Sequence, residues 1–258
     1  MLASRPLPCS PRQPPTVHPS IEDAHFSRWH RRCHRCSTVA PPHQGRAYGY
    51  RNHAVPCQGA TIEATGATAV LVDAFDVAAL ERAVRMAGAV LVIHQLTDLP
   101  REPDPVMIAS SRARNARLRI EGTRNLVSAV RAAAAMHRII AQSLATAYAP
   151  GPEPHGEADP LDVAAEGDRA VSVQGVMALE HSVLATPGIT GIVLRYGPGT
   201  WRDRPAERPS LHVDAAAHAA LLAVTRGGGG AYNIADDDGA VSIAKARAEL
   251  GFDPAFRL

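Results

Sequence analysis

The chain has 258 residues, enough for one α/β domain with or without a small lobe. Hydrophobic residues make up 46% of the chain and aromatic residues 4%, so the expected core consists of Ala, Val, Leu and Ile. The formal net charge of +2 is too small to indicate nucleic acid as the main partner. No apolar run reaches the roughly 18–20 residues that span a bilayer, and the first residues lack the apolar core of a secretion signal. All four cysteines precede residue 58. We therefore expect a cytoplasmic protein that has no membrane partner and is not built on disulfides.

The composition divides the chain at about residue 58. Residues 1–58 are rich in Pro, Arg, His and Cys and show no sustained helical or strand period. This pattern predicts an irregular or disordered N-terminal segment. Residues 59–258 alternate between apolar strand-like runs and helix-like segments, which predicts a single α/β domain there.

The predicted elements of the second part follow one another in a regular order. Short apolar runs predict strands at 69–72, 89–93, 138–142, 190–195 and 232–235. Helices are predicted between them at 77–86, 112–135, 170–184 and 215–224, and Asp214 is the expected N-cap of the last helix. Continuous apolar strands separated by helices indicate a mostly parallel sheet covered on both faces, which is the doubly wound α/β architecture.

Several segments of this part resemble motifs of one protein family, in the order in which that family has them. They are Val72-Asp-Ala-Phe-Asp76, Val92-Ile-His-Gln-Leu96, Glu121-Gly-Thr-Arg-Asn-Leu126, Gln142-Ser-Leu-Ala-Thr-Ala-Tyr148, Leu194-Arg-Tyr-Gly-Pro-Gly199, Leu211-His-Val-Asp214, Tyr232-Asn-Ile-Ala235 and Lys245-Ala-Arg-Ala-Glu-Leu-Gly251. From about residue 60 onward the chain thus resembles the NAD-dependent epimerase/dehydratases, or extended short-chain dehydrogenases. The resemblance implies a Rossmann-like fold with a small C-terminal substrate lobe at about 196–258. It also implies NAD or NADP as cofactor and hydride transfer on a nucleotide sugar or a related alcohol or ketone.

Candidate cofactor-binding residues fall where predicted parallel strands end. Asp73, His94 and Ser143 are at such carboxyl ends, and open α/β sheets bind ligands in the crevice there. The resemblance implies that Asp73 meets the adenine and that His94, Gln95, Leu96 and Ser143 lie near the nicotinamide and its ribose. Simpler interpretations stay open: a turn residue for Asp73, a core histidine for His94, and a small strand-ending residue for Ser143.

The resemblance also supplies candidates for catalysis and substrate binding. Leu144 occupies the place of the family's catalytic hydroxyl, so the neighbouring Ser143 is the candidate hydroxyl, and Tyr148 is a second candidate for acid/base work. Arg195 and Tyr196 are the candidate substrate-binding residues. We expect no metal among these side chains.

The acid/base pair of the family is missing. Its enzymes use a Tyr and a Lys on one helical face, spaced Tyr-x-x-x-Lys. The chain has a single Lys, Lys245, and no Tyr stands at the required spacing before it. When the helix is aligned on Glu180, Ser172 and Val176 occupy the Tyr and Lys positions. Three functions stay open: an impaired enzyme, a non-catalytic Rossmann-like protein that binds NAD(P) or a metabolite, and a product that cannot fold.

The glycine-rich phosphate loop of the family is also absent from residues 1–58. Permitted codons for Arg32-Cys-His-Arg-Cys36, read one base later, encode Gly-Val-Thr-Gly-Ala, which resembles the start of that loop. The same shift through Gln44–Val55 permits a sequence resembling the family's second strand. We hypothesise that residues from about 30 to 58 are an out-of-frame reading of a Rossmann start.

A zinc site is the competing interpretation of the same segment. Its candidate ligands are His30, Cys33, His34, Cys36, His43 and Cys57, but the second ligand pair has irregular spacing for structural zinc. The remaining partner expectations are a small-molecule substrate and a homodimer formed through the helices at 112–135 and 170–184.

Overall fold

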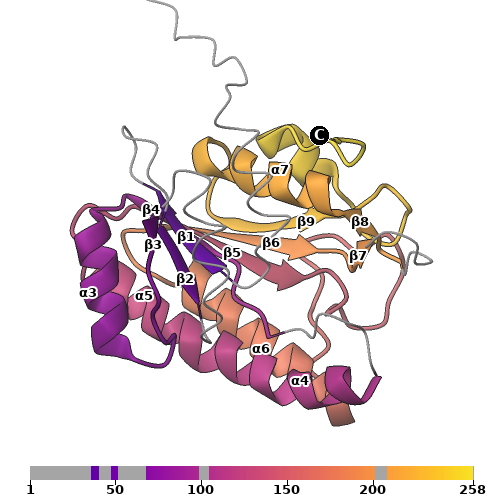
Figure 1. The fold of residues 1–258 in the computed structure, drawn as a ribbon. Helices are drawn as coiled ribbons and strands as arrows, with labels where there is room; N and C mark the ends of the chain where they lie inside the picture. Colours follow the sequence, from indigo (N-terminus) through magenta and orange to yellow (C-terminus); the bar gives the residue numbers. More distant parts are fainter. Residues whose placement is uncertain (1–35, 41–47, 52–67, 99–104, 201–207, 258) are drawn as a thin grey trace, which may run out of the picture.

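The computed structural model describes residues 36–40, 48–51, 68–98, 105–200 and 208–257. Seven strands form one sheet in the order β3-β2-β1-β4-β5-β6-β9 (Figure 1). A further pair, β7 (Gly199–Thr200) and β8 (Leu211–His212), forms a small parallel sheet beside it. The seven-stranded sheet is the frame that positions the candidate site.

Four strands form the parallel half of the sheet. They are β4 (Leu91–His94), β5 (Arg138–Leu144), β6 (Thr190–Tyr196) and β9 (Gly230–Ile234). Each pairs in parallel with the next, with Leu91 opposite Arg138 and Ile192 opposite Gly230. Their carboxyl ends therefore meet at one edge of the sheet, as the sequence predicts.

The first strands depart from an all-parallel arrangement. β1 (Cys36–Ala40) runs antiparallel to both β4 and β2 (Tyr48–Arg51), whereas β2 is parallel to β3 (Thr68–Ala69). Because Ala40 pairs with Leu91, the carboxyl end of β1 lies at the amino edge of β4. β1 and β2 lie within the segment whose composition predicts irregular structure. The domain boundary at residue 58 stays a prediction.

Helices cover both faces of the sheet. α3 (Val77–Ala87), α4 (Pro105–Arg117), α5 (Thr123–Arg131) and α6 (Gly167–Leu184) lie on one side, and α7 (Val213–Thr225) lies on the other (Figure 1). Because alternate residues of a strand face opposite sides of the sheet, the hydrophobic core is divided into two parts. Val92, Ile139 and Val193 pack with the first group of helices, while Ile93, Ile140 and Ile192 pack with α7 and with η3 (Ala246–Leu250). This confirms the doubly wound α/β fold.

The long helix predicted at 112–135 is interrupted in the structure. α4 and α5 are separated by a π-helical turn, η2, over Leu118–Gly122. A Cβ on Gly122 would lie 3.0 Å from Leu118 Cδ1 and 3.5 Å from Ala74 Cβ, so the glycine allows the close packing at this turn. A periodicity of apolar residues does not show one extra residue in a helical turn, and the prediction of one continuous helix was wrong for this reason.

Two smaller expectations need correction. Asp214 is not the N-cap of α7, because the helix begins at Val213 and His212 Nδ1 accepts a hydrogen bond from Asp214 N at 3.1 Å. The strand predicted at 69–72 is paired only over Thr68–Ala69. Val72 is buried, so its apolar character reflects core packing rather than strand pairing. Among the described helices, none is long and apolar enough to cross a membrane.

Candidate functional site

The carboxyl edge of β4, β5, β6 and β9 brings most of the predicted residues together. Strand register places Ser143 opposite Arg195, and Arg195 opposite Asn233. His94 is the last residue of β4, and Gln95 follows it. β4 borders β5 on the side opposite to β6. This edge is the candidate site. Asp73 follows β3, at a distance along the sheet from these strands.

A buried ion pair occupies the centre of this edge. Arg195 Nε donates to Glu180 Oε1 at 3.0 Å, and Arg195 Nη2 donates to Glu180 Oε2 at 2.7 Å. Ser143 Oγ donates to the same Glu180 Oε1 at 2.6 Å. Burial opposes the charge of Arg195, but its hydrogen bonds and its attraction to Glu180 raise its pKa above the ordinary value. Both candidate residues therefore already bind a protein carboxylate, and their roles toward substrate and cofactor stay predictions.

Tyr148 extends the same network toward β9. Its hydroxyl accepts from Arg195 Nη1 at 2.8 Å and donates to Asn233 Oδ1 at 2.7 Å. Its ring stacks on His155 with the centroids 5.0 Å apart. Burial raises the pKa of Tyr148, so the hydroxyl stays protonated at neutral pH. In this arrangement Tyr148 links the loop after β5 to the sheet.

His94 and Asp73 make contacts that agree with the simpler interpretations, and their roles toward the cofactor stay predictions. His94 is buried, its Nδ1 accepts from Leu96 N at 3.3 Å, and its Nε2 lies 2.8 Å from Thr123 Oγ1. Burial, and then the nearby charge of Arg119, lowers the pKa of His94 to about 4, so the ring is neutral at pH 7. Asp73 is exposed, and its Oδ1 accepts from Phe75 N at 2.9 Å in a turn.

Gln95 carries an unsatisfied buried acceptor. Its Nε2 donates to Tyr196 Oη at 3.4 Å, and Tyr196 Oη donates to Ala216 O at 3.2 Å. Within the described part of the chain, Gln95 Oε1 is buried without a hydrogen-bond partner. An unpaired buried acceptor is costly and indicates a place for a donor from a ligand or water. Burial raises the pKa of Tyr196, so this hydroxyl is also a neutral group.

The helix that carries the family's Tyr and Lys presents different chemistry. On α6, Ser172 Oγ donates to Asp168 O at 3.3 Å, and Val176 is fully buried. Lys245 Nζ donates to Ala231 O at 2.8 Å and lies 4.3 Å from the Tyr232 ring centroid, near the amino end of β9. The single Lys of the chain is thus held at the opposite edge of the sheet and cannot replace the missing one.

Sequence reasoning missed two polar residues, Asn233 at this edge and Arg119 in η2. Asn233 stands inside a segment identified only as a strand, and its side chain donates to His155 O and Ser242 O, both at 3.1 Å. Arg119 precedes Gly122 within the π-helical turn. A polar residue inside an otherwise apolar strand was the available signal for Asn233.

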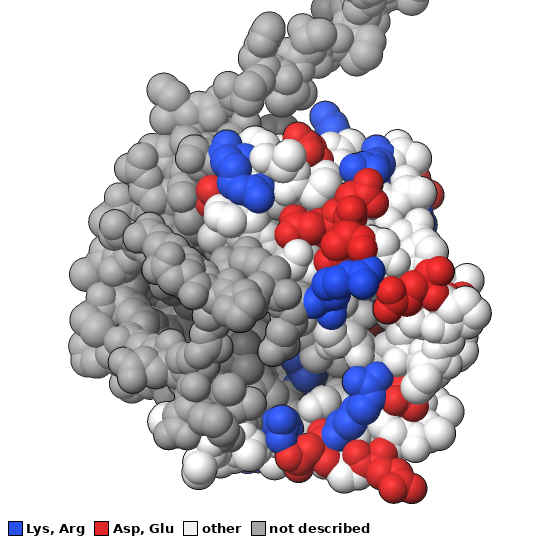
Figure 2. Space-filling view, turned by 90° about the vertical axis from the view of Figure 1, so that its right-hand side faces the viewer, with Lys and Arg blue, Asp and Glu red and all other residues white. Residues whose placement is uncertain are grey.

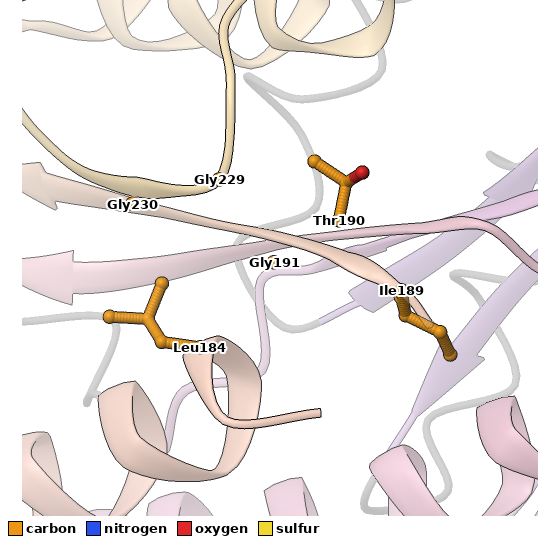
Figure 3. A pocket seen from close by; sticks show the side chains of 6 residues that line it. All are labelled: Leu184, Ile189, Thr190, Gly191, Gly229 and Gly230. Carbon is orange, nitrogen blue, oxygen red and sulfur yellow. The ribbon is translucent and has the colours of Figure 1, made fainter. Parts of the chain in front are cut away.

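Two other surface features are a face of mixed charge and a small pocket. In Figure 2 acidic and basic side chains are interspersed over the described part of the face. A pocket lies at the amino ends of β6 and β9, and Figure 3 shows its six labelled residues: Leu184, Ile189, Thr190, Gly191, Gly229 and Gly230. It opens at the edge opposite the carboxyl ends. Apart from the backbone of Cys36, the candidate zinc ligands lie outside the described residues.

Comparison with known proteins identifies a curated relative. No protein-family model matches the chain. The 3-diazoavenalumate denitrifying reductase of a Streptomyces species is 38% identical over 196 residues, which are 66% of this chain and 62% of that protein. The chain therefore spans less than two thirds of the relative's length.

Solved structures share the fold at low sequence identity. A double mutant of DesIV, a dTDP-glucose 4,6-dehydratase from Streptomyces venezuelae, with NAD bound, has a TM-score of 0.64 at 16% identity, over 82% of this chain and 83% of that one. The enzyme WbmG from Bordetella bronchiseptica, in complex with NAD and UDP, has a TM-score of 0.60 at 16% identity, over 82% and 81%. A UDP-glucose 4-epimerase from Thermotoga maritima has a TM-score of 0.56 at 17% identity, over 74% and 80%.

Proposed function

We propose that this chain, whose fold is that of the NAD-dependent epimerases and dehydratases, is an NAD(P)H-dependent reductase that works without a Tyr/Lys proton relay. The observation that carries the proposal is on α6, where Ser172 and the buried Val176 stand at the positions that resemble the family's Tyr and Lys. Reduction of a ketone needs a proton on oxygen, and neither of these two residues replaces the Tyr/Lys pair that supplies it in the family. A substrate whose carbon accepts hydride without protonation of a heteroatom avoids that requirement.

The name of the curated relative indicates one such substrate class. A denitrifying reductase of a diazo compound removes nitrogen by reduction. For an arenediazonium substrate, hydride adds to the ring carbon, and the carbon–nitrogen bond breaks with its electron pair leaving on nitrogen. The products are the arene, N₂ and the oxidised nicotinamide, so atoms and charge balance with no proton donated by the protein. We therefore infer an aryl diazo or diazonium compound as the substrate class.

The residues predicted to lie beside the nicotinamide support the binding of this cofactor. Gln95 Oε1 is a buried acceptor without a partner among the described residues, and the carboxamide of a nicotinamide carries N–H donors. His94 stays neutral and forms a hydrogen bond with Thr123, so it shapes the end of β4 without adding charge there. When bound, NAD(P)H would supply the hydride. The protein's own contribution is to orient the two reactants and to exclude water.

The described residues offer no typical binding site for the pyrophosphate of the dinucleotide. Backbone N–H groups at a helix start following the first strand normally hold the phosphates. Because β1 runs antiparallel to β4, its carboxyl end lies at the amino edge, and no described glycine-rich turn begins a helix at the carboxyl edge. We therefore expect weak dinucleotide binding and reduced activity in this chain.

A second candidate is a non-catalytic protein that binds NAD(P) or a metabolite. The hydrogen bonds at the carboxyl edge of the sheet favour this candidate. The side chains of Ser143, Tyr148 and Arg195 are all bonded to other protein side chains there. The expected nucleotide-sugar substrate remains a third prediction, based on the ligands of the fold neighbours. The missing Tyr/Lys pair weighs against it.

The proposed reaction is tested by following the transfer of deuterium from the cofactor to the product. Purified protein is incubated with an arenediazonium salt that bears a carboxylate and with NADPH deuterated at C4 of the nicotinamide. The expected result is enzyme-dependent deuterium at the ring carbon that carried nitrogen. Cofactor binding without deuterium transfer would favour the binding protein, and turnover of a nucleotide sugar would overturn the proposed substrate class.

One variant and a matched control test the cofactor contact. Gln95→Leu removes the buried unpaired oxygen, and we expect a higher KM for NADPH with no loss of thermal stability. Gln174→Leu alters an exposed glutamine of α6 and is expected to leave that KM unchanged. An unchanged KM in the Gln95→Leu variant would remove Gln95 from the cofactor site.

A further inference from the structure

Arg119 occupies an unusual position in the fold. It lies in η2, the π-helical turn that separates α4 from α5. Such turns are rare within α-helices and occur frequently at functional sites. Thr123, the residue after η2, lies 2.8 Å from His94 Nε2 at the carboxyl end of β4, and the charge of Arg119 contributes to the lowered pKa of that ring. The turn thus carries a cation toward the candidate site.

The packing of α6 fixes this position. A Cβ on Gly175 would lie 3.0 Å from Ala116 Cα and 3.5 Å from Arg119 Cδ. α4 and α6 therefore make close contact at Gly175. The aliphatic part of the Arg119 side chain packs on α6 beside this glycine. Gly175 immediately precedes Val176, the position that resembles the family's Lys. Arg119 thus brings a positive charge to the region where that Lys charge is missing.

The charge of Arg119 has no counterpart among the described residues. The arginines of the preceding helix α4 form ion pairs: Arg112 with Asp168, Arg114 with Asp98, and Arg117 with Glu121. Arg119 forms neither an ion pair nor a hydrogen bond with any residue that the structure describes, although most of its side chain is enclosed.

Its protonation is preserved despite this enclosure. Burial lowers the pKa of Arg119 to about 10, which leaves it charged at neutral pH. An enclosed guanidinium with no ion-pair partner among the described residues is costly, and a bound anion would offset that cost.

We propose that Arg119 binds an oxyanion at the junction of η2, α6 and the carboxyl end of β4. The planar guanidinium donates two parallel hydrogen bonds to a carboxylate or phosphate, which is the geometry such groups favour. The oxyanion belongs either to the substrate, as a carboxylate, or to the cofactor, as a phosphate. This binding does not depend on the proposed reaction, because it requires only the cation and its surroundings.

The test uses the full chain without cofactor. Thermal unfolding is followed with increasing sodium cinnamate or inorganic phosphate, while sodium chloride keeps the ionic strength constant. We expect one of the two anions to raise Tm saturably. Arg119→Gln should weaken that binding roughly tenfold or more, since it removes a charge-assisted pair. Arg124→Gln changes an exposed arginine of the adjoining helix and should bind as wild type does.

The identity of the effective anion assigns the source. Stabilisation by cinnamate indicates a substrate carboxylate, whereas stabilisation by phosphate indicates the dinucleotide. A second variant keeps the proposal testable if Arg119→Gln folds poorly: Arg119→Met should raise Tm in the absence of anions, because it removes an uncompensated charge. A lower Tm for Arg119→Met, or equal anion binding in Arg119→Gln and wild type, would overturn the proposal.

Discussion

The carboxylate of Glu180 accepts hydrogen bonds from both Nε and Nη2 of Arg195, at 3.0 and 2.7 Å. This ion pair joins α6 to β6 inside the core. Ser143 and Tyr148 attach to the pair from two sides. The carboxyl edge is therefore held together by one continuous polar network. Networks of this kind are stable when every member is satisfied and costly when one is removed.

Removal of the Glu180 carboxylate should destabilise the protein strongly. Glu180→Gln leaves Arg195 charged and buried without its anion, so the free energy of unfolding should fall by about 3–5 kcal/mol. Urea unfolding followed by circular dichroism measures this change. Glu166→Gln, at an exposed position before the same helix, should change it by less than about 0.5 kcal/mol. Equal effects in the two variants would show that the pair adds nothing to stability.

His94 should make stability depend on pH. Its pKa is about 4 in the folded protein, against an ordinary value of 6.5 for a histidine in the unfolded chain, so the unfolded chain binds a proton first as the pH falls. Its contribution is fully present above pH 6.5 and is lost between 6.5 and about 4. This loss amounts to about 3 kcal/mol. His94→Asn should flatten that part of the profile, and His181→Asn, at an exposed position, should not. Parallel profiles for wild type and His94→Asn would contradict the assignment.

Gly191 should be intolerant of any side chain. A Cβ there would collide with the backbone carbonyl of Val183, where the end of α6 packs on the start of β6. We expect Gly191→Ala to lower the free energy of unfolding by about 1–3 kcal/mol or more. A Cβ at Gly156 would meet nothing within 4 Å, so Gly156→Ala serves as the control and should be near neutral. Thermal unfolding of the two variants separates the effects.

The reading-frame hypothesis is tested by the underlying DNA. We expect the codons for Arg32–Cys36 to encode Gly-Val-Thr-Gly-Ala when read one base later. Codons that cannot encode those residues would exclude the hypothesis. If the shifted frame is correct, a gene that restores it should give a protein with tighter NAD(P) binding, measurable by cofactor fluorescence. Equal affinity in the two proteins would show that the segment does not limit binding.

The parallel half of the sheet was predictable because each of its strands is a continuous apolar run. Val92, Ile139 and Val193 are buried on one face, and their neighbours are buried on the other, as a covered parallel sheet requires. The direction of β1 was not predictable, because strand direction depends on pairing with a distant strand and leaves no local period. The tight contacts at Gly122 and Gly175 depend on tertiary packing for the same reason.

The candidate site was predictable in location more than in chemistry. Strand ends placed Gln95, Ser143 and Arg195 at one edge, as the structure has them. Hydrogen bonds between them and Glu180 or Tyr196 depend on side-chain geometry that a sequence does not carry. Arg119 was missed since an arginine in an exposed-looking helix resembles any solvated charge.

The π-helical turn at Leu118–Gly122 has a consequence for the helices on its two sides. A turn with one extra residue rotates everything after it by about 100° relative to a continuous α-helix. This phase shift lets Ala116 face α6 while Thr123 faces His94. A continuous α-helix over the same residues could make only one of these two contacts. Deletion of a single residue from the turn would therefore turn Leu126 and Val130 out of the core, even though every side chain that packs there would still be encoded.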